Sequence, residues 1–221
     1  INTCLAASVT VANTLAGIAE RVGADWREIV PALKLDARIG PAAYLDPGLG
    51  LAGGNIERDV AALRGIAARE GADAALLAAI ASNSAHARDW AWRALDAARL
   101  PQDATVALLG LAYKPDTHSI KNSAGVALAR GLRGRPLRVH DPAVDAACLD
   151  DPGVVACAGP LEAARGADAV VIATPWAEYR RIDPAALARA MRGRTVIDPY
   201  RVLDGEAYAR AGLEHFVLGR A

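Results

Sequence analysis

Hydrophobic residues recur at helical spacing through the first part of the chain. An apolar residue stands at every third or fourth position up to Gly23, which predicts one apolar stripe on a helix of about six turns. The stripe consists of Leu5, Val9, Ala12, Leu15, Ile18 and Val22. Asp25 is placed to cap a second helix, WREIVPALKL, with Glu28 three residues on, as in a capping box. Segments 56–69 and 74–99 are predicted to form two further helices rich in alanine.

From Pro101 onward the pattern changes to short apolar runs separated by helical segments. The predicted strands are TVALLG, LRVHD, GVVAC, AVVIAT, TVIDP and HFVLG, and helices fit between them at 123–132, 160–165 and 184–191. Strands that alternate with helices predict a parallel sheet covered by helices on both faces. The sequence therefore predicts an α/β protein, with an all-helical domain at 1–100 and a parallel-sheet domain at 101–221.

Composition and charge argue against nucleic acid and membranes as partners. The chain has 221 residues, 53% of them apolar, and its formal net charge is zero, so it carries no broad electrostatic footprint for nucleic acid or anionic membranes. We expect no membrane helix, because no apolar run approaches the roughly 20 residues that such a helix needs, and no signal peptide is visible. The three cysteines, Cys4, Cys148 and Cys157, lack metal spacing. We therefore expect buried free thiols in a reducing, cytoplasmic compartment and no metal site.

A glycine-rich stretch, LDPGLGLAGGNIERD at 45–59, is the first candidate for chemistry. Glycine at this density indicates that the backbone turns sharply or approaches a ligand closely. Lys114, in GLAYKPDT after a predicted strand, is placed to bind a phosphate, although a solvated loop lysine is the alternative. Arg38 could fork onto a phosphate or carboxylate, or instead cap the carbonyls of a helix end. No G-x-G-x-x-G follows any predicted strand, so the sheet domain lacks a dinucleotide fingerprint.

Taken in order, these segments resemble the UDP-glucose/GDP-mannose dehydrogenase family. The resemblance covers nearly the whole chain and is carried by RVGADWREIVPALKLDARIGPAAYL, LDPGLGLAGGNIERD, VALLGLAYKPDTHSIKNSAG, VHDP, ADAVVIATPWAEYRRID and VIDPYRVLDG. It implies a central helical dimerisation domain followed by a Rossmann-like domain that binds the nucleotide sugar. Family members also have an N-terminal NAD domain. Because the chain starts at Ile1 inside a helical pattern, we expect a fragment that lacks this domain and is inactive alone.

The resemblance implies NAD-dependent oxidation of a UDP-glucose-like nucleotide sugar at C6, towards the uronic acid. In the family a cysteine thiolate attacks the intermediate aldehyde, and an aspartate follows four residues later. In this chain Asp59 holds the aspartate position and Asn55 the cysteine position, while Asn2 matches an asparagine at the reacting centre. The implied catalytic residues are therefore Asn2, Asn55 and Asp59. The implied substrate-binding residues are Arg38, Tyr44, Leu45, Gly50, Gly53, Lys114 and Arg201, the last one place late in its motif.

Asn55 leaves two functions open. An amide does not form the covalent adduct that a thiolate forms with an aldehyde, so the first hypothesis is a dehydrogenase with altered chemistry, in which Asn55 donates a hydrogen bond to the oxyanion. The second is a catalytically inactive relative that binds a nucleotide sugar or a partner subunit. Cys4 is an alternative nucleophile, on the apolar helix. Under both hypotheses we expect a homodimer formed through the central helices, with NAD bound mainly by a domain absent from this chain.

Overall fold

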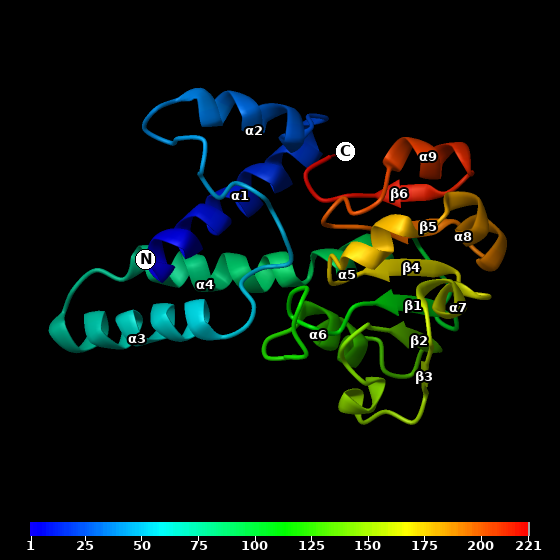
Figure 1. Ribbon diagram of the computed structural model, residues 1–221. Helices are drawn as coiled ribbons and strands as arrows, with labels where there is room; N and C mark the ends of the chain where they lie inside the picture. Colours follow the sequence, from blue (N-terminus) through cyan, green and yellow to red (C-terminus); the bar gives the residue numbers. More distant parts are fainter. Residues whose placement is uncertain (221) are drawn as a thin grey trace. The chain divides into compact units, whose positions relative to one another are not determined.

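The computed structural model describes residues 1–220, which form two compact units. The helical unit contains residues 1–88 together with 218–220, and the sheet unit contains residues 89–217 (Figure 1). This division falls before the boundary at residue 100 that the change in pattern predicts. It also returns the last residues of the chain to the helical unit, where the N–H of Trp26 donates to the carbonyl of Gly219 at 2.8 Å.

The helical unit is built from four helices: α1 (Asn2–Val22), α2 (Trp26–Leu35), α3 (Asn55–Glu70) and α4 (Ala75–Arg88). Gly23 ends α1 in the left-handed conformation, with φ 75°, and the Asp25 side chain accepts from the N–H of Arg27 to cap α2. Helix α1 packs along α3 and α4. The small core between them consists of Ala6, Leu51, Val60 and Ile80.

Two faces of α1 differ in what they contact. The face turned into the unit consists of small residues, chiefly Ala6, Ala12, Ala16 and Ala19. Most of the predicted apolar stripe lies on the outside instead, where Ile18 is 51% and Val22 70% exposed. Alanines on the inner face allow the helices to approach closely. The larger apolar side chains lie on the outer face of α1, where the described residues leave them exposed.

Length and composition would allow α1 to cross a membrane. Its 21 residues include an 18-residue window of mean hydropathy 1.2, so the expectation that no segment reaches this length is wrong for α1. Core helices of globular proteins meet the same criterion. Of that window 28% is buried within the structure, against α3 and α4.

The helix predicted over 74–99 is two helices. It is interrupted at Asp89, which adopts φ −83° and ψ 3°, and continues as α5 (Trp90–Ala97). Helix α5 contacts the sheet. The break is small, because the N–H of Arg93 still donates to the carbonyl of Asp89 in a helical pattern. The apolar pattern of the sequence gives little sign of it.

The sheet unit confirms the predicted α/β class. Six parallel strands lie in the order β3-β2-β1-β4-β5-β6. They are β1 (Val106–Leu109), β2 (Leu137–His140), β3 (Val154–Ala156), β4 (Ala169–Ile172), β5 (Thr195–Ile197) and β6 (Glu214–Phe216). The crossovers contain helices α6 (Ala124–Gly131), α7 (Pro160–Ala164), α8 (Pro184–Ala190) and α9 (Gly205–Arg210), and 3-10 turns η1 (Ala146–Leu149) and η2 (Ala177–Arg181).

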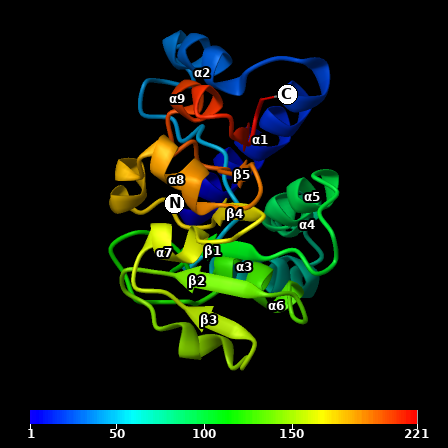
Figure 2. The ribbon, with the colours of Figure 1, turned by 90° about the vertical axis from the view of Figure 1, so that its right-hand side faces the viewer.

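Helices cover both faces of this sheet, with α7 and α8 on one side and α5 and α6 on the other (Figure 2). The central strands β1 and β4 are buried along their whole length. Two of the three cysteines, Cys148 and Cys157, are half-buried in this unit, and burial raises the pKa of both thiols. The prediction of a buried thiol is wrong for Cys4, which is exposed on α1.

Candidate functional site

The glycine-rich loop that precedes α3 is fastened by side chains from three helices. Each of these contacts pairs a loop backbone group with a buried or half-buried side chain. Trp26 Nε1 donates to the Leu45 carbonyl at 2.9 Å, the Gly48 N–H to Asn13 Oδ1 at 2.8 Å, and the Leu51 N–H to Ser84 Oγ at 2.9 Å. A loop held at three points keeps one backbone path, which is what preorganised binding requires.

Glycine is required where the loop passes α4. Gly50 has φ 76°, and a Cβ atom there would lie 2.4 Å from the carbonyl oxygen of Ser84. Further on, Gly53 and Gly54 have φ 86° and 96°, and they deliver the chain to Asn55, the first residue of α3. The side chain of Asn55 is exposed at this helix N-terminus.

The start of α3 is tied to the end of α4. Arg88 Nη2 lies 2.7 Å from Glu57 Oε1, and both side chains are about three-quarters buried, at 28% and 25% exposure. The same nitrogen approaches the Leu51 carbonyl at 3.5 Å. This ion pair therefore fixes the first turn of α3, and with it the position of Asn55.

The structure brings together two of the three predicted catalytic residues. Asn2 Nδ2 donates to Asp59 Oδ2 at 2.6 Å, although 57 positions separate the two residues. Arg58 Nη2 also lies 3.1 Å from the carboxylate, on Oδ1. The hydrogen bond from Asn2 and then that from Arg58 hold the pKa of Asp59 below its usual value. Asp59 is consequently a charged acceptor near neutral pH.

We expect Asn2→Ala to raise the pKa of Asp59 towards its ordinary value near 3.8. The substitution removes the stronger of two donors that favour the charged carboxylate. A carboxyl-carbon NMR titration of labelled aspartate measures the change. Arg58→Ala, which removes the second donor together with its charge, should also raise the pKa; an Asp59 titration identical in wild type and Asn2→Ala contradicts the contact.

A depressed carboxyl pKa also fixes the sign of any stability effect. The contribution from Asp59 is present above the pKa of the unfolded chain and is lost as the pH falls through the folded value. Asn2→Ala should therefore reduce this acid-dependent component and leave the stability unchanged at pH values well below the folded pKa of Asp59.

In the sheet unit, the loop after β1 carries Lys114 and lies at the carboxyl edge of the strands. Gly110 begins it with φ 109°, and its Cα faces Thr174 so closely that a Cβ would lie 2.5 Å away. The Tyr113 N–H donates to the Ser119 carbonyl at 2.9 Å and closes the loop. Lys114 is exposed, with its Nζ 5.8 Å from the centre of the Tyr113 ring. The ammonium group is therefore accessible to an anion.

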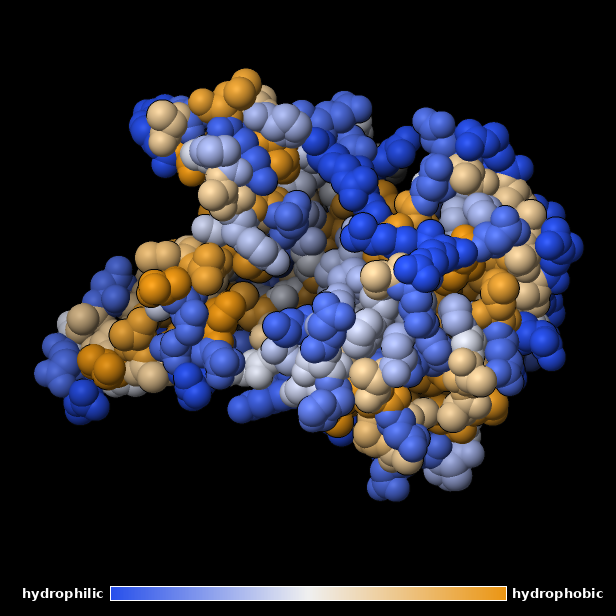
Figure 3. Space-filling view, viewed as in Figure 1, coloured by the Kyte–Doolittle hydropathy of each residue, from blue (hydrophilic) through white to orange (hydrophobic). Residues whose placement is uncertain are grey.

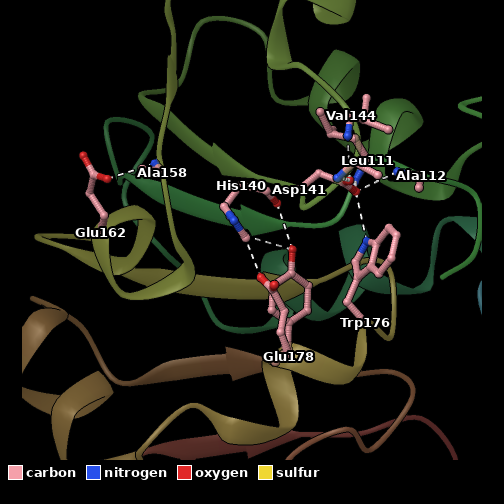
Figure 4. Close-up of polar contacts among 11 residues, drawn as sticks. Leu111, Ala112, His140, Asp141, Val144, Ala158, Glu162, Trp176 and Glu178 are labelled. Atoms are coloured by element: carbon pink, nitrogen blue, oxygen red, sulfur yellow. Dashed lines mark hydrogen bonds and ion pairs between the residues drawn. The ribbon is translucent and has the colours of Figure 1, made fainter. Parts of the chain in front are cut away.

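Polar groups from β2 and the turn after β4 gather beside this loop (Figure 4). Asp141, directly after β2, accepts from the N–H of Leu111 at 2.6 Å and from Trp176 Nε1 at 3.1 Å. His140 Nδ1 lies 3.2 Å from the hydroxyl of Tyr179. Burial lowers the pKa of His140, so its ring is held neutral.

The remaining predicted residues are spread over both units. Arg38 is exposed and makes two bonds to Asp36, at 2.9 and 2.6 Å, rather than to helix carbonyls. Tyr44 is exposed, beside the buried Leu45. Arg201 follows β5 in the left-handed conformation, with φ 50°, and is half-buried.

The comparisons with known proteins agree with the order of these parts. Residues 1–85 match the central domain, and residues 107–205 the UDP binding domain, of the UDP-glucose/GDP-mannose dehydrogenase family. The chain belongs to this family. It is 30% identical over 230 residues to UDP-glucose 6-dehydrogenase from Pseudomonas aeruginosa and 34% identical over 221 residues to that from Haloferax volcanii. These alignments cover 99% and 97% of the chain but 51% and 49% of the relatives, so it spans about half their length.

Solved structures of the family share the fold. A UDP-glucose dehydrogenase from Pyrobaculum islandicum superposes with a TM-score of 0.84 at 28% identity, over 99% of this chain and 49% of that one. A UDP-D-ManNAc dehydrogenase from Pyrococcus horikoshii, at 24% identity, gives 0.82 and covers 99% of this chain and 50% of that chain. The UDP-glucose/GDP-mannose dehydrogenase fold thus holds for both units.

Sequence reasoning missed the residues that hold this family member's loops in place. Arg88, Asn13 and Ser84 lie on helices at positions that read as ordinary polar surface. Asp141 is the exception, because the sequence shows an acid directly after a buried strand, and such a position lies at the ligand-binding edge of a parallel sheet.

Proposed function

We propose that this chain is the substrate half of an enzyme that oxidises a UDP-glucose-like nucleotide sugar at C6, towards the uronic acid, with NAD. The observation that carries the proposal is the 2.6 Å contact between Asn2 and Asp59 beside the glycine-rich loop. It joins two residues that the family resemblance assigns to one reacting centre. The match of residues 107–205 to a UDP binding domain supports the nucleotide part.

The proposal gives each unit its own task. In the sheet unit, Lys114 and Arg201 contact the nucleotide as cations at the carboxyl ends of β1 and β5. In the helical unit, the loop with Gly50 and Gly53 lies along the sugar. Arg38, Tyr44 and Leu45 complete the substrate-binding set. No metal is assigned a role.

The described residues do not fit NAD itself. The spacing G-x-G-x-x-G occurs at Gly48, Gly50 and Gly53, but helix α2 and a loop precede it rather than a strand. In the sheet unit, residues 110–123 separate β1 from α6, where a dinucleotide site has a tight turn. We therefore assign NAD to a part of the protein that these residues do not include, and derive no step through it.

Asn55 sets the limit of the proposed chemistry. Its amide can donate a hydrogen bond to a developing oxyanion, but it cannot form the thiohemiacetal that precedes a second oxidation. The first form of the proposal is an enzyme that stops at the aldehyde or uses its hydrate. The second candidate, an inactive relative that keeps the nucleotide sugar, is favoured by the absence of any cysteine from residues 45–59.

We further propose that the protein is a cytoplasmic homodimer that pairs through the central helices. Leu15, Ile18 and Val22 lie exposed along α1. Apolar surface also gathers over α3, where Leu63 and Ile66 are exposed at 40% and 45% (Figure 3). Exposed apolar surface of this kind is typical of protein–protein contacts. A monomer in sedimentation velocity would count against the dimer.

We expect the chain to bind UDP and UDP-glucose in titration calorimetry, and Lys114→Ala to weaken both about tenfold by removing one cation from the phosphates. Lys34→Ala, on α2, is the charge-matched control and should leave binding unchanged. Equal losses in the two variants, or no binding of UDP by wild type, would contradict the proposal.

The yield of NADH, measured on a protein that includes the NAD-binding part, distinguishes the dehydrogenase from the inactive relative. One NADH per nucleotide sugar means an alcohol-to-aldehyde enzyme, and two mean that full oxidation survives without the loop cysteine. No NADH, with UDP-glucose still bound, means the inactive relative.

A further inference from the structure

A single carboxylate, that of Asp141, joins the ends of three adjacent strands. Its Oδ1 accepts from the N–H groups of its own segment, Ala143 at 2.8 Å and Val144 at 2.9 Å. Its Oδ2 reaches the segment after β1, where the N–H groups of Leu111 and Ala112 donate at 2.6 and 2.9 Å. The same oxygen accepts from Trp176 Nε1, after β4, at 3.1 Å (Figure 4).

These five donors use the full hydrogen-bonding capacity of the group. An ionised carboxylate offers about four lone-pair sites and no donor. In dinucleotide-binding sheets the acid after the second strand points outward and binds a ribose hydroxyl. Asp141 stands at the corresponding strand end, but it is occupied by protein donors and has no lone pair left for a ligand.

The contacts converge on Leu111 and Ala112, just before Lys114 in the chain. The N–H of Ala112 is bound by Asp141, and its carbonyl accepts from Thr174 Oγ1 at 2.6 Å. Thr174 is fully buried and packs against Gly110. The peptide groups on both sides of Ala112 are thus held from opposite sides, two residues before the ammonium-bearing side chain.

We infer that Asp141 is a positioning residue, which places the Lys114 loop for the nucleotide without touching the nucleotide itself. The inference deepens the proposed function and rests on it for the identity of the ligand. Asp141 acts by fixing the backbone of Leu111 and Ala112 against the turn that bears Trp176. Charge-assisted bonds are about twice as strong as neutral ones, so an amide in its place holds the loop less firmly.

The first measurement is amide hydrogen exchange on the whole 221-residue chain, which needs no ligand. Asp141→Asn should speed exchange in 111–119 about tenfold while β1 and β4 keep their protection. Asp145→Asn is the matched control, since Asp145 lies on the same segment and its side chain accepts from the N–H of Ala147, within its own turn. It should leave 111–119 unchanged.

Two results overturn the inference at this stage. Unchanged exchange in 111–119 means that Asp141 does not hold the loop, and uniform loss of protection over the sheet unit means that it is merely structural. If Asp141→Asn does not fold, Trp176→Phe removes one donor and keeps an aromatic, though smaller, ring in the core. It should then give a smaller rise confined to the same segment.

The second measurement is UDP affinity in a double-mutant cycle. Because Asp141 acts through Lys114, Asp141→Asn should weaken UDP about tenfold alone and add little to Lys114→Ala. The ratio of affinities for UDP and 2′-deoxy-UDP should be the same in wild type and Asp141→Asn. Additive losses, or a ratio that falls to one in the variant, would show a ligand contact and overturn the inference.

The two measurements separate the inference from the proposed function. A wild-type chain that does not bind UDP refutes the nucleotide part of the proposed function. The exchange rates of 111–119 still decide whether Asp141 positions the loop.

Discussion

Gly125→Ala is expected to destabilise the sheet unit by about 3 kcal/mol, among the largest effects of one methyl group in this chain. A Cβ on Gly125, in the first turn of α6, would lie 2.2 Å from the carbonyl oxygen of Gly110 and 3.2 Å from the Cβ of Ala173. The nearest obstacle is backbone, so no side-chain rotation relieves it. Helix α6 would have to move away from the end of β1.

Gly131→Ala, in the last turn of the same helix, is the matched control. Its Cβ would meet the ring of Trp92 at 3.6 Å, an ordinary van der Waals contact. Alanine is also the better helix former by roughly 0.5–1 kcal/mol, so this variant should be as stable as wild type or more so.

Differential scanning calorimetry on both variants and wild type measures the difference, and hydrogen exchange assigns the affected transition to the sheet unit. A Gly125→Ala protein with wild-type stability would mean that α6 and β1 lie further apart than described. Because the clash bears on the carbonyl of Gly110, where the loop that carries Lys114 begins, UDP affinity should fall together with stability.

The strands could be predicted from the sequence because the central strands of a parallel sheet are buried on both faces. Runs such as AVVI in β4 are apolar throughout, since both faces of a central strand are covered. The short helix α9 was missed, although Asp204 caps it through the N–H groups of Glu206 and Ala207. Six residues are too few to show a helical period.

The site was predictable only in part. The resemblance placed Asn2 and Asp59 at one centre, but their contact depends on how α1 packs against α3, which no local pattern encodes. Asp141 was visible as a strand-end acid, yet its saturation by backbone N–H groups was not. The distant donors are the backbone N–H of Leu111 and the indole N–H of Trp176, about thirty residues away on either side.

A thiol placed at position 55 should be unusually reactive. Asn55 begins the 16-residue helix α3 after Gly54, which supplies no side-chain cap, so the first N–H groups of the helix are left for a neighbouring anion. Such positions hold the pKa of a thiol below its ordinary value of about 8.5. Two acids lie near position 55, and both are paired: Glu57 with Arg88, and Asp59 with Asn2 and Arg58. We expect Asn55→Cys to be alkylated at pH 7 about tenfold faster than an exposed thiol elsewhere on the helix.

The experiment follows iodoacetamide labelling against pH by peptide mass spectrometry. A Cys4→Ser background removes the exposed native thiol. Ala61→Cys is the control, because it is exposed on the same helix but lies beyond the first turn. Cys148 and Cys157 report the slow limit, since burial raises the pKa of both.

Either result bears on what the loop is for. Faster labelling at 55 than at 61 means that the glycine loop and the start of α3 still form a site that stabilises an anion beside Asp59. The asparagine then occupies a position built for a thiolate, and an oxyanion on the substrate is the species it is placed to meet. Equal rates at the two positions would mean that the helix N-terminus exerts no pull on charge. The oxyanion role of Asn55 would then lose its physical basis, and the inactive, nucleotide-sugar-binding relative would be the better account of the chain.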